Sequence, residues 1–176
     1  MVFIGNDPVQ SEICINDQIL ERVNEFTYLG FKLSFLEESD ISDKIVKFNK
    51  SIGIMKPSLV QRHTRVCLFK ILARPTLCYS SEAWTLIKSD EHRITTSEMK
   101  FMRRAYKVGQ KRNEEVLQAL NIIPTIDYIL YKYQKDWLSH VNRMPRGRIP
   151  RAILNYNPQG KRSLGRPRKR WRENFQ

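Results

Sequence analysis

The chain has 176 residues and a formal net charge of +13, from 31 basic and 18 acidic side chains. This length suits one domain, or one domain with a tail, and the excess of positive charge favours a polyanionic partner. Three widely spaced cysteines exclude a disulfide framework and a zinc pattern. No apolar run approaches membrane-spanning length and no signal peptide is recognisable, so we expect an intracellular protein without a membrane partner.

The charge is unevenly distributed along the chain. Residues 1–50 hold five basic and nine acidic side chains, a net of −4, so the other 126 residues hold +17. An acidic beginning and a basic remainder favour one face for protein contact and another for phosphate.

Short strands are predicted at the N-terminus. Residues 11–15 and 18–23 read as a hairpin around an Asn16-Asp17 turn. Residues 26–33 read as one further strand, in which Gly30 marks a bulge or a close backbone approach. We expect a small antiparallel sheet, which is marginally stable alone because short strands bury little.

Helical periodicity begins at Asp40. A helix with Ser39 or Asp40 as its cap is expected to stop at Pro57, and a second, from about Thr64, to kink or end at Pro75. Further helices are predicted over residues 89–107 and 114–120, and from a Thr125 cap to Met144-Pro145. The sequence thus predicts an α+β fold, mostly α: a small N-terminal antiparallel sheet, a helical bundle and a partly disordered basic tail.

The last thirty-odd residues are strongly basic. Glu173 is the first acidic residue after eleven cationic ones, which are Arg143, Arg146, Arg148, Arg151, Lys161, Arg162, Arg166, Arg168, Lys169, Arg170 and Arg172. Guanidinium groups at this density need an anion, and nucleic-acid phosphates accept bidentate Arg contacts. A solvated tail and a nuclear-import signal are the alternatives. Gly165-Arg166-Pro167 resembles a minor-groove hook, an alternative to simple phosphate contact.

Catalytic patterns are missing from the sequence. It contains neither Asp-Asp nor Asp-x-Asp, and no Gly-rich phosphate loop or Gly-x-Ser-x-Gly turn. The residues by themselves favour a binding module over an enzyme, and we expect no bound cofactor or metal.

Five segments, in order, resemble non-LTR (LINE-type) retrotransposon endonuclease–reverse transcriptases. The segment from Val23 resembles the Phe-x-Tyr-Leu-Gly primer grip, and the one from Asp43 the helix after it. The segment from Phe69 resembles the thumb signature Pro-x-Leu-x-Tyr-Gly-x-Glu-x-Trp. The last two resemble Trp-x-Gly-His-x-x-Arg-Met and Gly-Lys-Arg-x-x-Gly-Arg-Pro-x-x-Arg-Trp. In this chain the five segments are, in order, Val23-Asn-Glu-Phe-Thr-Tyr-Leu-Gly-Phe-Lys-Leu-Ser, Asp43-Lys-Ile-Val-Lys-Phe-Asn-Lys, Phe69-Lys-Ile-Leu-Ala-Arg-Pro-Thr-Leu-Cys-Tyr-Ser-Ser-Glu-Ala-Trp, Asp136-Trp-Leu-Ser-His-Val-Asn-Arg-Met and Gly160-Lys-Arg-Ser-Leu-Gly-Arg-Pro-Arg-Lys-Arg-Trp. Ser80 and Ser139 stand where the family usually has glycine.

The resemblance implies a palm-end primer-grip segment (1–38), a helical thumb and post-thumb region (39–142) and a basic C-terminal tail (143–176). Its partners would be the template–primer nucleic acid and the fingers and palm of the parent polymerase, and its location the nucleus. The family's catalytic Asp residues, which hold Mg²⁺, are absent here, so the chain would be inactive alone. The expected nucleic-acid contacts are Tyr28, Leu29, Gly30, Arg143, Lys161, Arg162, Arg166, Arg168, Lys169, Arg170, Trp171 and Arg172.

Two questions stay open at the level of sequence. The chain could instead be a stand-alone nucleic-acid-binding protein derived from a retrotransposon, or a truncated product without function. Trp171 could stack on an unpaired base, or it could be a packing residue that ties the tail to the helices.

Overall fold

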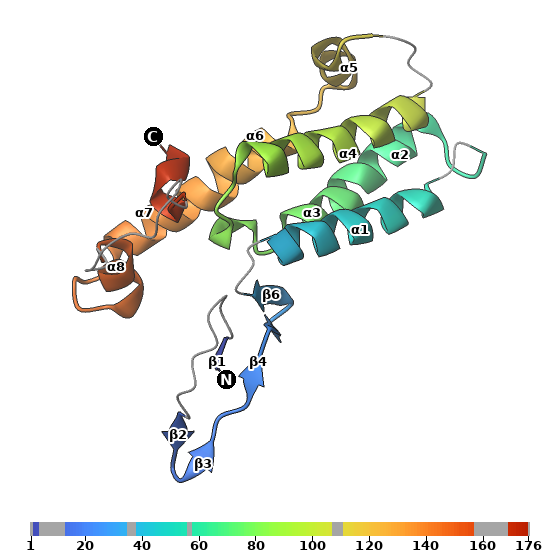
Figure 1. Cartoon of the computed structure of the whole chain (residues 1–176). Coiled ribbons are helices and arrows are strands. Elements are labelled where there is room, and N and C mark those ends of the chain that lie inside the picture. The colour runs from blue at the N-terminus through green and yellow to red at the C-terminus, as the bar shows by residue number, and fades with distance from the viewer. Residues whose placement is uncertain are drawn as a thin grey trace. The chain divides into compact units, whose positions relative to one another are not determined.

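The computed structural model describes residues 2–3, 13–34, 38–55, 58–106, 111–156 and 169–175. The chain divides into two compact units, Met1–Val46 and Lys47–Gln176. Short strands belong to the first unit and most helices to the second, which confirms the predicted α+β, mostly α fold class (Figure 1).

The first hairpin forms where it was predicted. Strands β2 (Cys14–Ile15) and β3 (Gln18–Ile19) are antiparallel, and the turn residues Asn16 and Asp17 have φ of 50° and 61°. Left-handed φ at both central residues is the geometry that two-residue hairpin loops require, and Asn and Asp tolerate it well. Strand β1 (Val2–Phe3) pairs in parallel with β4 (Arg22–Val23).

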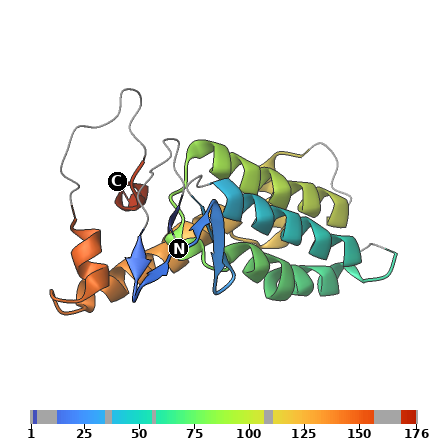
Figure 2. The same ribbon diagram turned by 60° about the horizontal axis from the view of Figure 1, so that its bottom comes forward.

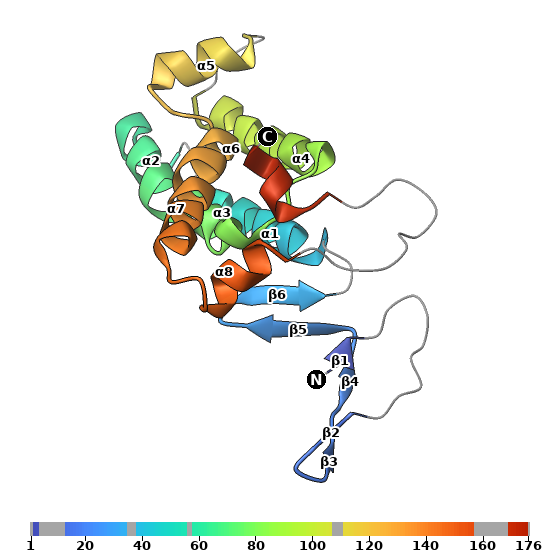
Figure 3. The ribbon, with the colours of Figure 1, turned by 90° about the vertical axis from the view of Figure 1, so that its left-hand side faces the viewer.

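The prediction of one continuous strand over residues 26–33 was wrong. Strands β5 (Glu25–Tyr28) and β6 (Phe31–Ser34) form a second antiparallel hairpin (Figure 3), and Leu29 and Gly30 form its turn. Their φ values are 48° and 77°. Gly30 supplies a positive φ that the turn needs. The prediction failed because alternation of polar and apolar residues is the same in one long strand and in two short strands of a hairpin.

Polar contacts join this hairpin to the beginning of helix α1 (Glu38–Ile54) within the first unit. The Lys32 amide donates to Asp40 Oδ1 at 3.0 Å, and Lys44 Nζ donates to the Gly30 carbonyl at 3.1 Å. Lys32 Nζ lies 2.8 Å from Glu25 and 3.4 Å from Asp43. Since the helix begins at Glu38, Asp40 lies inside its first turn and neither Ser39 nor Asp40 is the cap that was predicted. Pro57, the expected stop signal, lies outside the described residues.

Three aromatic rings form the core of the second unit. Phe48, Phe69 and Phe101 are fully buried and come from α1, a π-helical turn η1 (Phe69–Ala73) and α4 (Lys88–Tyr106). The ring centroids of Phe48 and Phe69 lie 6.3 Å apart, and those of Phe69 and Phe101 lie 5.2 Å apart and stack. Figures 1 and 2 show these helices side by side.

The sequence predicts that Pro75 kinks or ends the second helix, and the helix does not end there. The helix runs from α2 (Arg62–Leu68) through η1 into α3 (Arg74–Cys78), with Pro75 in the first turn of α3, where a missing amide hydrogen is tolerated. The irregularity is the π-helical turn directly before it. The Thr76 hydroxyl also donates to the Leu72 carbonyl at 2.8 Å.

The predicted later helices are present. Helix α4 and helix α5 (Asn113–Leu120) match their predicted ranges to within a residue, and Asn121, at φ 50°, closes α5 in the left-handed conformation. The last predicted helix comprises α6 (Thr125–Tyr128), a π-helical stretch η3 (Ile129–Gln134) and α7 (Lys135–Arg143). Its N-cap is Pro124 rather than the predicted Thr125. Sequence reasoning missed the short helices η2 (Ser81–Ala83), α8 (Ile149–Leu154) and η4 (Trp171–Phe175).

Candidate nucleic-acid interface

The end of the basic stretch is held on the second unit by side-chain hydrogen bonds. The indole nitrogen of Trp171 donates to the Glu82 carbonyl at 2.6 Å, and Lys169 Nζ donates to the Leu86 carbonyl at 2.7 Å. The Trp171 ring also lies edge-on to Phe175, with centroids 5.1 Å apart. The segment 169–175 is therefore docked against the segment 81–86.

Gln134 and Asn174 extend this docking into the helices. Gln134 is fully buried, and its amide nitrogen donates to the Ser81 and Trp84 carbonyls at 3.0 and 2.9 Å. The Asn174 amide donates to the same Trp84 carbonyl at 3.0 Å and to Gln134 Oε1 at 3.2 Å. Buried polar groups are stable only when they are paired, so this network fixes where the C-terminal segment lies.

A second buried network fixes helix α6. Glu98 on α4 is 1% exposed; it accepts hydrogen bonds from the Thr125 amide at 2.9 Å and from the Thr125 hydroxyl at 2.6 Å. Arg74 donates to the Ile123 carbonyl, pairs with Glu98 at 3.4 Å and lies over the ring of Tyr128 at 5.4 Å. The Glu98 carboxylate thus satisfies an amide at the N-terminus of α6.

Cys78 is buried in the same region of the second unit. Burial raises the pKa of its thiol to about 12, with Arg74 opposing this rise and Glu98 adding to it. The thiol therefore stays neutral at ordinary pH, which makes it a packing group rather than a nucleophile.

An apolar groove with basic residues at its edge lies between α7, α8 and η4. Its volume is about 640 Å³. Trp137, Tyr156, Ile149 and Ile153 line it and are 40%, 67%, 73% and 66% exposed. Its complete lining is Glu82, Ala83, Trp137, Val141, Ile149, Pro150, Ile153, Leu154, Asn155, Tyr156, Arg170, Trp171, Arg172 and Glu173.

The structure brings part of the predicted binding set together at this groove. Arg170, Trp171 and Arg172 line it, Lys169 is bonded beside it, and Arg143 is exposed at the last residue of α7. Tyr28 is the last residue of β5 in the first unit, and Leu29 and Gly30 form the turn after it; all three are exposed. Lys161, Arg162, Arg166 and Arg168 lie outside the described residues, as does the Gly165-Arg166-Pro167 hook.

Three groove residues escaped the sequence analysis as binding candidates. Trp137 lies in α7, where helical spacing alone does not show that the residue is 40% exposed. Ile153 lies in α8, and Tyr156 lies two residues after its end. This helix is too short to give a periodic signal. The signal that the sequence offers is the four-residue spacing of Ile149 and Ile153 next to a basic run.

Ser80 has an unusual backbone conformation. Its φ and ψ are 59° and 15°, in the left-handed region, which an L residue with a Cβ adopts at a cost and glycine adopts freely. Ser139, by contrast, is an exposed residue inside helix α7.

Among the residues described here, no cluster of three His, Cys, Asp or Glu side chains could hold a metal ion. The described helices include none that is long and apolar enough to cross a membrane. Comparisons with family models, with curated proteins and with solved structures found no match.

Proposed function

We propose that this chain is the nucleic-acid-binding region of a LINE-type reverse transcriptase that comprises the primer grip, the helical thumb and the basic C-terminal segment. Its role is to hold a template–primer through phosphate contacts. The main support is the docking of residues 169–175, because it holds Arg170 and Arg172 at an aromatic groove on a helical body. A solvated tail would not need such anchoring.

The charge of the second unit also supports this proposal. Residues 47–176 hold twenty-eight basic and nine acidic side chains. Two of the nine acids are buried and paired, Glu98 with Arg74 and Asp90 with Arg93. Since each of these acids is paired with an arginine, the pairs cancel and the unit keeps its net charge of +19, which suits a polyanion.

The family resemblance gains support from backbone geometry at two of its positions. Ser80 occupies the usual glycine of the thumb signature and has the left-handed backbone that glycine favours. Gly30, which ends the Phe-x-Tyr-Leu-Gly segment, has φ of 77° in a tight turn, with Tyr28 and Leu29 exposed beside it.

Salt-dependent binding tests the proposal. If roughly five cationic side chains reach phosphates together, the logarithm of the binding constant should fall with log salt at a slope of about −4 to −5. The measurement is fluorescence anisotropy of labelled RNA, DNA and hybrid duplexes at several salt concentrations. A slope near zero, or no binding at low salt, would exclude a phosphate-holding role.

A variant in which four basic side chains are replaced by uncharged ones locates the binding charges better than a truncation does. Deleting residues 160–176 would also remove the Trp171 and Asn174 hydrogen bonds that dock the segment. Changing Lys161, Arg162, Arg166 and Arg168 to glutamine leaves these bonds in place and should flatten the slope by about 3. The matched control changes four exposed lysines elsewhere, Lys47, Lys50, Lys70 and Lys88. An equal change in both variants would mean that these four tail side chains contribute no more than lysines of the helical body.

A further inference from the structure

We propose that the groove between α7, α8 and η4 takes an unpaired nucleobase, so that the second unit binds single-stranded nucleic acid by base stacking as well as by phosphate contact. This inference rests on the proposed function, since it presumes a nucleic-acid ligand. It adds a binding site, a ligand class and a preference for strands that carry bases over abasic strands.

The size and lining of the groove suit a planar apolar ligand. Its volume of about 640 Å³ falls within the range of about 300–1,000 Å³ that is usual for small-ligand pockets. Apolar side chains from two helices, including Val141, Ile149 and Ile153, form much of its wall. Ile149 and Ile153 are more than half exposed, so this wall is open to a ligand.

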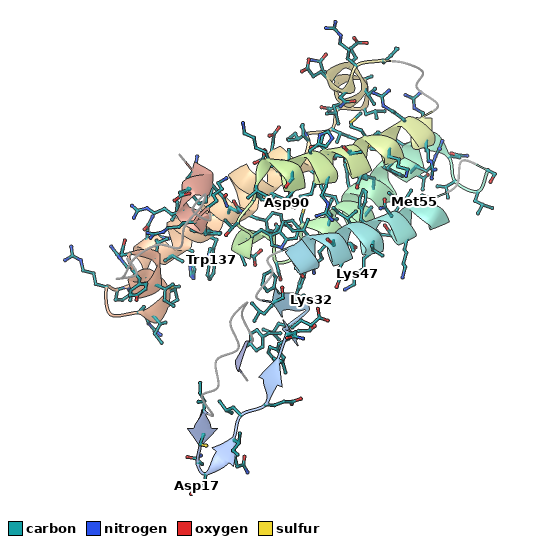
Figure 4. The ribbon with its side chains drawn as sticks, viewed as in Figure 1. Asp17, Lys32, Lys47, Met55, Asp90 and Trp137 are labelled. Carbon is teal, nitrogen blue, oxygen red and sulfur yellow. The ribbon has the colours of Figure 1, made fainter. Side chains whose placement is uncertain are left out.

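Aromatic side chains give the groove its selectivity for a base. Trp137 on α7 and Tyr156 after α8 line it, and the two residues are 40% and 67% exposed (Figure 4 labels Trp137). Every base has a π-face that stacks on such rings without regard to sequence. The rings of Trp137 and His140 lie 5.5 Å apart, which restricts how the Trp137 ring turns.

Trp171 acts as a positioning residue in this arrangement. Its indole N–H is already bonded to the Glu82 carbonyl, and its ring lies against Phe175. It therefore keeps Arg170 and Arg172 at the groove, while Trp137 and Tyr156 are the rings that meet the base.

The charge around the groove favours nucleic acid over a protein helix. Arg170 and Arg172 line the groove, exposed Arg143 ends α7, and exposed Arg146 and Arg148 lie in the connection from α7 to α8. Glu173 lines it too, and its carboxylate accepts the Arg170 amide at 3.2 Å. Arginines beside exposed rings match a backbone that carries a phosphate next to each base.

A pair of oligonucleotides separates base contact from phosphate contact. The full chain is titrated with a short single-stranded thymidine oligonucleotide and with an abasic oligonucleotide of the same length, at one salt concentration. The wild-type chain should bind the thymidine strand roughly 5- to 150-fold more tightly, the range expected for one stacked base. Equal affinities would overturn the groove assignment but leave the phosphate-holding function intact. Failure to bind either strand would overturn both.

Variants then assign the preference to the groove. Trp137→Ala and Tyr156→Ala should each remove most of the preference for the thymidine strand and change affinity for the abasic strand little. Trp137→Phe should retain the preference, since it keeps a stacking ring. Tyr79→Ala is the matched control, because Tyr79 is an exposed aromatic residue of the same unit outside the groove. If both groove variants keep the preference, with native circular dichroism, the base binds elsewhere and the inference is wrong.

Discussion

The two units of this chain differ in charge and in core. Residues 1–46 hold three basic and nine acidic side chains, a net of −6, whereas residues 47–176 hold twenty-eight and nine, a net of +19. Of the seventeen buried hydrophobic residues in the described parts of the chain, Ile41 alone belongs to the first unit. The second unit therefore has both the hydrophobic core and the excess of positive charge. The strands of the first unit share in neither.

The first unit instead exposes apolar side chains. Ile15, Ile19, Tyr28 and Leu29 are each more than half exposed, on two hairpins of short strands. Two-stranded ribbons of this size bury too little surface to offset the loss of chain entropy. Their shape is set by local turn residues and by a few polar bonds to α1, while the second unit is held by contacts between distant segments.

Amide hydrogen exchange should show the largest difference between the units. We expect exchange near the unprotected rate at β2 and β3, where opening costs little. The buried part of α4, around Ile94 and Phe101, should exchange only through global unfolding, which costs about 5–15 kcal/mol in ordinary domains. Mass-spectrometric exchange on the intact chain measures both. Similar protection in the strands and in α4 would show that the first unit has a core of its own.

Removal of the Glu98 carboxylate should produce the next largest effect, confined to the second unit. Glu98→Ala leaves Arg74 buried without its acidic partner and the Thr125 amide without an acceptor, and should destabilise the unit by about 3–5 kcal/mol. Urea unfolding followed by circular dichroism measures this loss. Glu91→Ala, on the same helix but part-exposed, is the control and should change stability by less than about 0.5 kcal/mol.

The result for Glu98 also bears on the comparison of the two units. Exchange in β2, β3 and the β5–β6 turn should be unchanged in Glu98→Ala, because their hydrogen bonds are made inside the first unit. Loss of the β5–β6 hairpin together with the helices would mean that the two units unfold cooperatively.

The sequence reveals those features whose causes lie close together in the chain. Asn16-Asp17 predicts its own turn, and the helical spacing of Ile94 and Phe101 predicts α4, since both depend on neighbouring residues. Gln134 gives no such signal, because its partners Ser81 and Trp84 are fifty or more residues away. The same holds for Trp171 and Glu82. The sequence offers docking by Trp171 as one of two alternatives, but it gives neither the partner Glu82 nor the groove that the docking helps to form. The turn at Gly30 was not predicted either, because a hairpin and a single strand show the same alternation of polar and apolar residues.

Two serine-to-glycine changes should produce the smallest effects, with opposite signs. Ser80 adopts a left-handed φ of 59°, and its hydroxyl makes no hydrogen bond within the described residues. Ser80→Gly removes the steric cost of the Cβ and loses little else, so it should stabilise the second unit by about 0.5–1 kcal/mol, after the greater entropy of glycine in the unfolded chain is subtracted. Ser139→Gly is the matched change inside helix α7, where φ is helical and glycine is unfavourable; it should destabilise by about 0.5 kcal/mol. Thermal and urea unfolding of both variants, side by side with the wild type, measure the difference.

Destabilisation by both changes would mean that Ser80 is not held in the left-handed region, and it would remove the backbone support for reading Ser80 as the family's glycine. Opposite signs would show that the second unit keeps its long-range contacts by accepting local strain at Ser80, whereas the β2–β3 hairpin of the first unit has turn residues, Asn16 and Asp17, that tolerate the left-handed region.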